Sequence, residues 1–273
     1  MPPSTEKTIA VLGAGAMGGS IARGLVASHT VDAAHVLACD PSQDRLDSLA
    51  LLGIQTFASA QDMLAGSLDV LVVAVKPQVL PAVLEDVADK LEDRLVISIA
   101  AGVPLETLTE LVPSARLVRA LPNLPVQVLS GATALCLGDT ATPQDGELAV
   151  ALFSCLGSAH VMREDQLDAE GAVVSCGPAY VALFADLMVR AAVEHGMTAP
   201  AAREMVLSTI CGVSRQLLGS GDHPRAYMER VTSPGGTTAA GLRAMEPILF
   251  DAIERGVDAA LERTGQLADK GRA

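Results

Sequence analysis

Three glycines near the N-terminus have a spacing that can form an anion-binding turn. They stand in the run Gly13-Ala14-Gly15-Ala16-Met17-Gly18, between a predicted strand over Thr8–Leu12 and a predicted helix over Ser20–Ser28. The first glycine permits a tight turn, the second lets a pyrophosphate approach the backbone, and the third lets the helix pack on the strand. Free N–H groups at the helix start bind the anion. The motif predicts a dinucleotide site, and an ordinary strand-to-helix turn is the alternative.

An acidic residue, Asp40, stands at the end of the next predicted strand, Val36–Ala38, about twenty residues after the last glycine. A carboxylate at this point accepts hydrogen bonds from the ribose hydroxyls of the cofactor and repels a 2′-phosphate, which favours NADH over NADPH. Ser42 and Arg45 lie just beyond it and could still receive a phosphate. Alternatively, Asp40 simply begins the following helix.

Two further loops follow buried strands of the same predicted sheet. Val75–Pro77 ends the strand predicted over Val70–Val75, and Ala100-Ala101 follows the strand predicted over Leu95–Ile99. Ligands of open α/β sheets bind outside the carboxyl ends of the strands, so both loops are placed to line a cofactor crevice. Lys76 fits its position equally well as a solvated lysine at the start of a loop.

Two later segments carry groups suited to a small substrate. Arg119–Pro125 places Asn123 between prolines, in a rigid loop that can aim an amide into a cleft or form an ordinary Pro-Asn turn. Val231–Leu242 is a glycine-rich turn that leads into a helix, where the bare N–H groups of residues 236–238 suit a small carboxylate. A plain interhelical loop capped by serine or threonine is the alternative.

The composition excludes several classes of protein. The 273 residues are 50% hydrophobic but only 2% aromatic, and the net charge is −13 at pH 7. Such an acidic chain repels nucleic acids and anionic membranes, and it offers few side chains on which bases can stack. The five cysteines are dispersed, without a CxxC pair or a histidine cluster, so we expect neither disulfides nor a metal site.

Other signals favour a soluble, cytoplasmic protein. The N-terminus lacks the basic and hydrophobic regions of a signal peptide. The longest charge-free apolar stretch, around Ala172–Ala185, is shorter than the ~20 residues that span a bilayer. The sequence holds no Gly-x-Ser-x-Gly elbow and no HExxH motif, so hydrolytic and metal-dependent reactions have no residues to carry them. Because the sequence shows neither a signal peptide nor an apolar stretch long enough to span a bilayer, we expect no membrane contact.

The pattern of elements predicts two domains. Strand–helix alternation over residues 1–162 is typical of a Rossmann-like, doubly wound α/β sheet, with an added edge strand over Ala132–Leu137. Residues 163–273 predict helices only, which favours an all-α C-terminal dimerisation domain. The remaining predicted elements are the strand Leu117–Val118 and the helices Pro143–Leu156, Gln166–Ser175, Pro178–Glu194, Pro200–Leu218 and Pro247–Ala268.

Two of these helices, Pro178–Glu194 and Pro200–Leu218, are apolar around most of their circumference. A helix that is hydrophobic all round must be buried, and a domain of about a hundred residues has few places to bury several of them. We expect an interface between subunits to cover them. Packing inside one helical bundle is the alternative.

Together these motifs resemble the pyrroline-5-carboxylate reductase family over nearly the whole chain. The most specific segment is Val231–Leu242, which is close to the family signature. The other matching segments are Gly13–Gly18, Ala74–Gln78, Ser98–Val103, Arg119–Pro125 and Gly177–Tyr180. The resemblance implies hydride transfer from NAD(P)H to the imine carbon of 1-pyrroline-5-carboxylate, which gives L-proline in the last step of proline biosynthesis. It also implies a homodimer with interleaved C-terminal helices, and such dimers often form larger rings.

The resemblance also assigns roles by position. Contacts with the cofactor, NADPH or NADH, are implied for Gly13, Ala14, Gly15, Ala16, Met17, Gly18, Asp40, Val75, Lys76, Pro77, Ala100 and Ala101. Contacts with the substrate, a small molecule, are implied for Asn123, Ser233, Gly236, Thr237 and Thr238. The Thr238 hydroxyl is the expected catalytic group, because it would bond the ring nitrogen and assist its protonation. Water is the competing proton donor.

Three positions depart from the family pattern. Ser175-Cys176 replaces the usual Gly-Ser before Gly177, at a helix start near the substrate. Leu121 stands where methionine is common, which is a tolerable apolar exchange. Asp40 replaces a small polar residue that many members direct at the 2′-phosphate, and this argues against a preference for NADPH.

Two other functions fit the same motifs. Another imine or β-hydroxyacid reductase would use the same scaffold with a different substrate in the pocket. A dinucleotide-sensing regulator would bind NAD(P)H without oxidising it. The Ser-Pro-Gly-Gly-Thr-Thr run argues against the regulator, since a sensor has no evident need of a carboxylate site.

Overall fold

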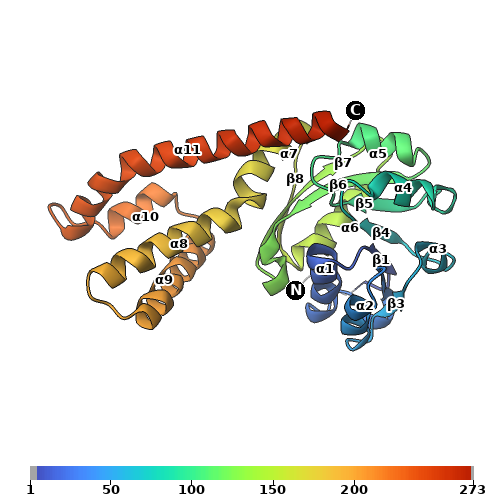
Figure 1. The fold of residues 1–273 in the computed structure, drawn as a ribbon, viewed down its shortest axis with the longest axis horizontal. Coiled ribbons are helices and arrows are strands. Elements are labelled where there is room, and N and C mark those ends of the chain that lie inside the picture. The colour runs from blue at the N-terminus through green and yellow to red at the C-terminus, as the bar shows by residue number, and fades with distance from the viewer. Residues whose placement is uncertain (1–4, 272–273) are drawn as a thin grey trace. The chain divides into compact units, whose positions relative to one another are not determined.

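The computed structural model describes the backbone of residues 5–271 and the side chains of residues 5–266. By its internal contacts the chain forms two units, Met1–Cys176 with Leu261–Ala273, and Gly177–Ala260. The first unit is built on one β-sheet, and the described elements of the second are all helices (Figure 1). The predicted fold class, a Rossmann-like doubly wound sheet followed by an all-α C-terminal region, is confirmed.

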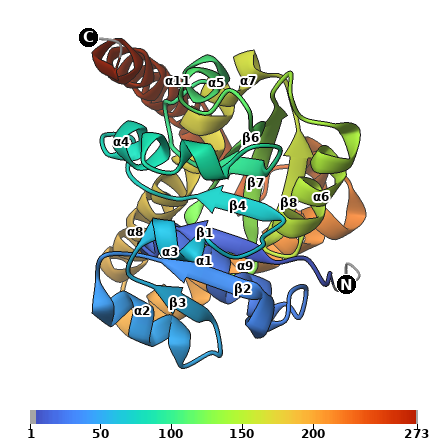
Figure 2. The same cartoon turned by 90° about the vertical axis from the view of Figure 1, so that its right-hand side faces the viewer.

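Eight strands form the sheet, in the order β3-β2-β1-β4-β5-β6-β7-β8 (Figure 2). Strands β1 to β6 are parallel, β7 runs antiparallel to β6, and β8 runs parallel to β7. The order reverses between β1 and β4, which is the switch point of a doubly wound sheet. The strands are Ile9–Leu12 (β1), Val36–Cys39 (β2), Gln55–Phe57 (β3), Val70–Val73 (β4), Leu95–Ser98 (β5), Arg116–Pro122 (β6), Gly131–Leu137 (β7) and Gly157–Val161 (β8).

Helices cover both faces of the sheet. The α-helices of this unit are α1 (Ala16–Ala27), α2 (Gln43–Ala50), α3 (Ala60–Met63), α4 (Leu80–Glu85), α5 (Leu105–Leu111), α6 (Pro143–Ser154) and α7 (Glu164–Glu170). Three short 3₁₀ turns, η1 (Ala33–His35), η2 (Ala88–Lys90) and η3 (Leu124–Val128), and one π-helical turn, η4 (Gly171–Ser175), complete it.

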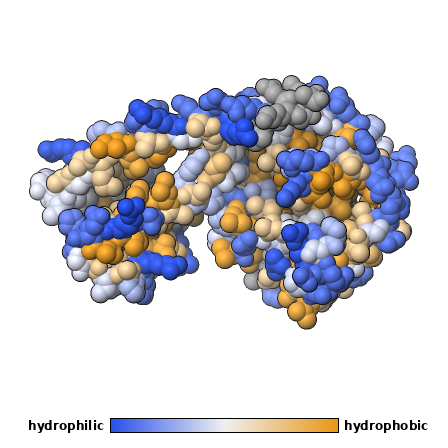
Figure 3. All heavy atoms as spheres, in the orientation of Figure 1, coloured by the Kyte–Doolittle hydropathy of each residue, from blue (hydrophilic) through white to orange (hydrophobic). Residues whose placement is uncertain are grey.

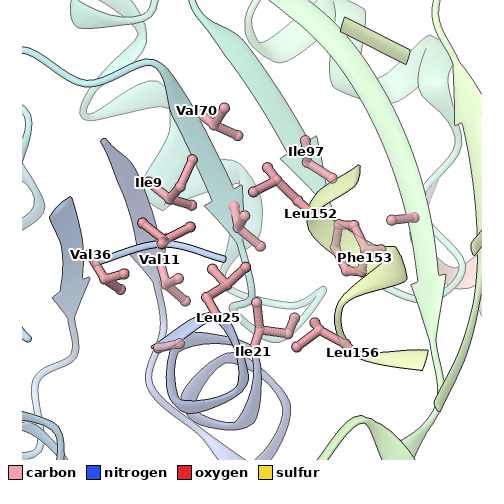
Figure 4. Close-up of a cluster of buried hydrophobic side chains, with 14 of the residues drawn as sticks. Ile9, Val11, Ile21, Leu25, Val36, Val70, Ile97, Leu152, Phe153 and Leu156 are labelled. Carbon is pink, nitrogen blue, oxygen red and sulfur yellow. The ribbon is translucent and has the colours of Figure 1, made fainter. Parts of the chain in front are cut away.

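Alternate side chains of the central strands enter two different cores. In β1, Ile9 and Val11 belong to a cluster with α1 and α6, whereas Ala10 and Leu12 belong to a cluster with α3, α4, α5 and α7. Figure 4 shows the first cluster, in which side chains of α1 and α6 meet those of the strands. Burial on both faces explains why these strands are continuous apolar runs in the sequence.

The prediction of an edge strand over Ala132–Leu137 is wrong, because the strand that contains these residues, β7, lies between β6 and β8. Sequence patterning misses β8, since its Gly-Ser-Ala-His-Val run holds one β-branched residue. Gly157 has φ 147°, and a Cβ on it would lie 2.0 Å from the Gly131 carbonyl oxygen. Two glycines face each other here and let the strands approach.

The predicted strand Leu117–Val118 is also too short. β6 extends to Pro122 and pairs with β7 along five residues, up to the Pro122–Thr133 pair. Pro122 is the last residue of β6, so its lack of an N–H donor does not interrupt the hydrogen bonds along the rest of the strand. The predicted rigid loop therefore begins at Asn123.

The helical unit contains α8 (Gly177–Glu194), α9 (Ala199–Ser220), α10 (Pro224–Arg230) and the start of α11 (Thr237–Gly271). α8 and α9 pack against each other. The prediction that the last helix begins at Pro247 is wrong, because α11 begins at Thr237 and contains Pro247. A proline inside a helix removes one N–H donor, and the hydrogen-bonded turns on either side continue the helix across it.

Candidate active site

The glycine run forms the turn between β1 and α1, as its spacing predicts. Gly13 has φ 101°, and a Cβ on it would lie 2.8 Å from the Ala74 carbonyl oxygen. A Cβ on Gly18 would lie 1.9 Å from the Gly13 carbonyl oxygen. Both positions therefore need glycine, because any side chain would push β1, α1 and the loop after β4 apart.

Gly15 has a different environment, because it faces open space. The nearest atom to a Cβ on Gly15 is Nη1 of Arg45, at 4.0 Å. Gly15 is the N-cap residue of α1, no side chain caps this end of the helix, and its first turn holds no acidic residue. The helix start keeps its N–H donors and its positive dipole end, and both suit the diphosphate of a dinucleotide.

Asp40 follows β2 directly and is only 4% exposed. Its Oδ2 accepts a hydrogen bond from the N–H of Ala14 at 2.8 Å, and its Oδ1 accepts one from the N–H of Ser42 at 2.9 Å. Nη1 of Arg45 lies 3.3 Å from Oδ2. Asp40 therefore fixes the glycine turn to the loop before α2 and brings a negative charge to the edge of the turn.

The Val75–Pro77 and Ala100-Ala101 loops lie at the same edge of the sheet as the glycine turn. The N–H of Ala74 donates to the Leu12 carbonyl at 2.8 Å, so the chain leaves β4 beside the end of β1. β5 ends at Ser98, next to β4, and its loop follows. Lys76 is exposed and has no ion-pair partner among residues 5–266.

Asn123 lies at the end of β6 and is 9% exposed. Its Oδ1 accepts a hydrogen bond from the N–H of Ala132 at 2.8 Å, and its Nδ2 donates to the Val174 carbonyl at 3.2 Å. Val174 belongs to the π-helical turn η4. The amide of Asn123 therefore fastens this turn to the end of β6.

Sequence reasoning assigned no role to the partly buried ion pair between Arg119 of β6 and Glu164 of α7. Nη1 of Arg119 lies 3.0 Å from Oε1 of Glu164, and the side chain of Arg119 is 5% exposed. The same Glu164 oxygen accepts a hydrogen bond from the N–H of Leu105 at 2.7 Å. One carboxylate thus joins β6, α5 and α7. An arginine in the middle of an apolar strand was the signal that could have revealed it.

Glu170, the last residue of α7 before the π-helical turn, has a carboxyl group with an altered pKa. The hydroxyl of Ser175 donates a hydrogen bond to Oε2 of Glu170 at 3.1 Å. Burial raises the pKa of the Glu170 carboxyl, and the hydrogen bond from Ser175 opposes this rise. π-Turns inside α-helices are frequent at functional sites.

The cysteines make no bonds among themselves. Three of the five are buried, Cys176 and Cys211 are exposed, and all are free thiols. Burial, with a smaller contribution from the charge of Asp40, raises the pKa of Cys39 to about 11, so this thiol stays protonated. In the part of the chain that the structure describes, no three histidine, cysteine, aspartate or glutamate side chains are grouped to hold a metal ion.

The Ser233–Thr238 loop lies in the helical unit, at the start of α11. The N–H of Gly236 donates to the Ser233 carbonyl at 3.0 Å, and Gly235 has φ 74°, so the loop is a tight turn. No acidic residue lies in the first turn of α11. The hydroxyls of Ser233, Thr237 and Thr238 have no hydrogen-bond partner within the described residues. This exposed turn therefore offers N–H and O–H donors to a ligand.

The helical unit leaves many apolar side chains uncovered. Ala185 is the buried residue of α8, whereas Leu183 and Leu187 on the same helix are 59% and 50% exposed. In α11, Ile248 is 73% exposed and Phe250 is 63% exposed. Figure 3 shows hydrophobic residues gathered over α8, α9 and α11. A single chain does not bury these helices in one bundle, which favours the expected interface over the alternative of a bundle.

Residues 164–267 match the family described as pyrroline-5-carboxylate reductase dimerisation, and residues 8–102 match the family described as NADP oxidoreductase, coenzyme F420-dependent. The pyrroline-5-carboxylate reductase of Escherichia coli is 36% identical over 250 residues, which are 90% of this chain and 93% of that protein. The chain belongs to the pyrroline-5-carboxylate reductase family.

Two solved members of the reductase family share the fold over nearly their full length. The reductase of Coxiella burnetii is 30% identical with a TM-score of 0.91, over 97% of this chain and 99% of that one. The reductase of Plasmodium falciparum, solved with NADP bound, is 27% identical with a TM-score of 0.86, over the same shares of both chains. The resemblance inferred from the sequence motifs is confirmed.

Family membership also explains the apolar surface of the C-terminal helices. The matched dimerisation region contains α8, α9 and α10 and most of α11. By length and composition alone, the helical run Glu164–Glu194 would also pass as a membrane span, and 11% of its most apolar window is buried in the single chain. An interface between reductase subunits covers such a surface without lipid.

Proposed function

We propose that this protein reduces 1-pyrroline-5-carboxylate to L-proline, with NAD(P)H as hydride donor, in the last step of proline biosynthesis. The similarity to reductases of this name over nearly the whole chain carries the assignment. The reaction needs a site for a diphosphate and a site for a small carboxylate. The uncapped start of α1 and the open turn at the start of α11 have the donors for these two tasks.

We assign the dinucleotide to a first domain, residues 1–162, and substrate binding and dimerisation to a second, residues 163–273. The diphosphate would lie on the backbone of Gly13–Gly18, with Met17 and the alanines of the turn beside it. Val75–Pro77 and Ala100-Ala101 would line the nicotinamide, since small side chains at this edge let a ring approach the backbone. When bound, NAD(P)H supplies the hydride.

We further propose that NADH is preferred over NADPH. The buried carboxylate of Asp40 stands beside the glycine turn, where it can accept hydrogen bonds from ribose hydroxyls and repel a 2′-phosphate. Arg45 opposes this preference, because its side chain is 57% exposed and its guanidinium can turn from Asp40 toward a phosphate. In this structure the guanidinium of Arg45 lies beside Asp40, with Nη1 3.3 Å from Oδ2.

The side chains at the substrate site have mainly to position the reactants. A protonated imine is already electrophilic, so holding its carbon at the nicotinamide supplies most of the rate. The hydroxyls of Ser233 and Thr237 and the N–H of Thr237 would bind the carboxylate. Gly236 would let it approach the turn, since the N–H of Gly236 itself donates to the Ser233 carbonyl. The hydroxyl of Thr238 would donate to the ring nitrogen and assist its protonation. Asn123 would flank the substrate from the end of β6, where it already holds η4.

We also propose a homodimer with interleaved C-terminal helices, which can gather into a ring. The exposed apolar side chains of α8 and α11 support this, because two copies of one surface can cover each other about a two-fold axis. Free cysteines and an acidic surface support a location in the cytoplasm.

The test is steady-state oxidation of NADH and of NADPH, each with 1-pyrroline-5-carboxylate and with a six-membered cyclic imine. We expect the highest kcat/KM for NADH with the five-membered substrate. Binding of NAD(P)H without oxidation would indicate a dinucleotide sensor, and a higher kcat/KM for the six-membered ring would indicate a different imine reductase. A higher kcat/KM with NADPH would overturn the role given to Asp40.

A further inference from the structure

The loop over residues 99–104 connects β5 to α5 and carries the Ala100-Ala101 pair that we assign to the nicotinamide. Its first end is fixed by the sheet, because the N–H of Ile99 donates to the last carbonyl of β4 at 3.0 Å. Its middle is loosely packed, because Ala101 is exposed and a Cβ on Gly102 would meet no residue beyond its chain neighbours within 4 Å. The position of the alanine pair therefore depends on how the second end of the loop is held.

The second end of the loop is the start of α5, where the N-cap residue cannot cap the helix. Pro104 stands at this position, and its side chain has no acceptor. A helix start without a cap leaves N–H groups in need of partners. The N–H of Leu105, the first residue of α5, donates instead to Oε1 of Glu164 at 2.7 Å. The acceptor is an ionised carboxylate, which makes a strong hydrogen bond, and it comes from the first residue of α7.

Arg119 holds Glu164 in place. Its Nη1 lies 3.0 Å from the same Oε1 that accepts from Leu105, and its side chain is 5% exposed. Arg119 pairs with the last residue of β5 in the sheet register, so its strand runs directly beside the one that enters the loop. The other carboxylate of α7 near this guanidinium, that of Asp168, lies 3.9 Å from Nη2 and is 59% exposed. One oxygen of Glu164 therefore ties the second end of the loop to the sheet, as the N–H of Ile99 ties the first.

We propose that Glu164 is a positioning residue, which places the nicotinamide for hydride transfer by holding the N–H of Leu105 at the end of this loop. The inference rests on the proposed reductase function and deepens it, since Glu164 acts through the loop rather than on the reactants. The diphosphate is assigned to the start of α1, so loss of the Glu164 contact should spare most of the affinity for NADH. It should instead shift the nicotinamide ring relative to the substrate, and the rate of transfer falls steeply with such a shift.

The test compares three substitutions in α7 of the full-length protein. Glu164→Ala removes the acceptor of the Leu105 N–H, whereas Glu164→Gln removes the charge but keeps an oxygen that can accept. Asp168→Ala, the matched control, removes the other carboxylate beside Arg119 and takes no part in the hydrogen bond to Leu105. With NADH and 1-pyrroline-5-carboxylate, we expect kcat to fall about tenfold in Glu164→Ala, less than the ~100-fold cost of a misplacement of ~1 Å. The other two should keep the wild-type kcat, and all three should keep the wild-type dissociation constant for NADH.

Fluorescence anisotropy of bound NADH measures the placement of the ring without turnover. At saturating NADH, we expect lower anisotropy in Glu164→Ala, because a ring whose loop is released turns more freely, and wild-type anisotropy in Glu164→Gln and Asp168→Ala. A residue needed only for folding would lower the amount of bound NADH but not the anisotropy of the bound fraction. If Glu164→Ala does not fold, Glu164→Asp replaces it with the same expectation, since it keeps the charge beside Arg119 and shortens the reach to Leu105 by one methylene.

Three results would overturn this role of Glu164. The first is a wild-type kcat or a wild-type anisotropy in Glu164→Ala, and the second is an equal loss in Glu164→Gln. The third is a dissociation constant for NADH that rises in proportion to the fall in kcat, because the contact would then serve binding alone. Failure of the wild type to oxidise NADH with 1-pyrroline-5-carboxylate would refute the proposed reaction, and the anisotropy of the three variants would still decide whether Glu164 places the nicotinamide.

Discussion

The start of α1 and the start of α11 present the same backbone donors in opposite surroundings. At α1 the turn is enclosed, because Gly18 leaves no room for a Cβ and Asp40 holds the N–H of Ala14. At α11 the Ser233–Thr238 turn is exposed, and its hydroxyls have no partner in the described chain. We infer that a single chain organises the dinucleotide site by itself, whereas the substrate site is completed by a second subunit.

The largest effect should follow from breaking the interface. Leu187→Glu on α8 places a charge on a half-exposed apolar position, so we expect it to abolish dimerisation and turnover because the charge would have to be buried without a partner. NADH binding should persist. Sedimentation measures dimerisation, a steady-state assay measures turnover, and fluorescence titration measures NADH binding. Leu51→Glu, the same change at an 88% exposed position of the sheet unit, is the control and should leave all three unchanged.

The two turns should differ in their tolerance of one methyl group. A Cβ on Gly18 meets backbone at 1.9 Å, whereas a Cβ on Gly236 first meets the Ser233 hydroxyl oxygen at 2.5 Å, which can rotate away. We expect Gly18→Ala to cost about 3 kcal/mol of unfolding free energy and to abolish NADH binding. Gly236→Ala should retain the stability and the NADH binding of the wild type and raise the KM for 1-pyrroline-5-carboxylate. Urea unfolding measures the stability of each variant, and titration with NADH measures its binding. Equal losses of stability in the two variants would contradict the contrast.

The Thr238 hydroxyl should matter to turnover alone. We expect Thr238→Ala to lower kcat about 100-fold, a typical loss for a group that assists proton transfer. The dissociation constant for NADH should stay the same, since the proposed dinucleotide site lies in the other unit. Thr238→Ser should restore most of the rate. If Thr238→Ala weakens NADH binding instead, its assignment to the substrate is wrong.

Asp40 should set the choice of cofactor. Replacing it with serine removes the charge that repels a 2′-phosphate and frees Arg45, so the ratio of kcat/KM for NADPH to that for NADH should rise about tenfold. Asp44→Ser removes an exposed carboxylate from the first turn of α2 and should leave the ratio unchanged. An unchanged ratio in Asp40→Ser would assign this residue a structural role only.

The smallest effect concerns η4, which joins the sheet unit to α8. Burial raises the pKa of the Glu170 carboxyl above its ordinary value of 4.5. The contribution of Glu170 to stability is therefore complete below pH 4.5, and it is lost as the pH rises through the raised pKa of the folded state. Urea midpoints of the wild type should therefore fall relative to Glu170→Gln above pH 4.5. Asp165→Asn is the opposite control, because the hydrogen bond from Arg163 lowers the pKa of Asp165.

The sequence predicts the elements whose pattern is local. The glycine turn, the central strands and the long apolar helices follow from spacing and periodicity, and their bounds are correct to within a few residues. It misses β8 because a Gly-Ser-Ala-His-Val run has little strand propensity of its own and is held by pairing with β7. It misplaces the start of α11 because Pro247 is a start signal that the surrounding helix overrides.

The candidate site shows the same limit. Local spacing places Gly13–Gly18 and the Ser233–Thr238 turn at helix starts, which are local features. It cannot show that Asn123 fastens η4 or that Glu164 meets Arg119, because these pairs are far apart in the chain. Contacts of this kind depend on the finished sheet. A short window of sequence can show that Arg119 stands in an apolar strand and needs a partner, but it cannot show which residue that partner is.

The carboxylate of Glu164 has a practical consequence for dissecting the protein. A fragment that stops at residue 162 would retain Arg119 in β6 but lose α7, which carries both carboxylates that pair with its guanidinium, Glu164 and Asp168. It would also leave the N–H of Leu105 without its acceptor. A stable nucleotide-binding fragment has to carry α7 with it, although α7 lies in the region matched as dimerisation.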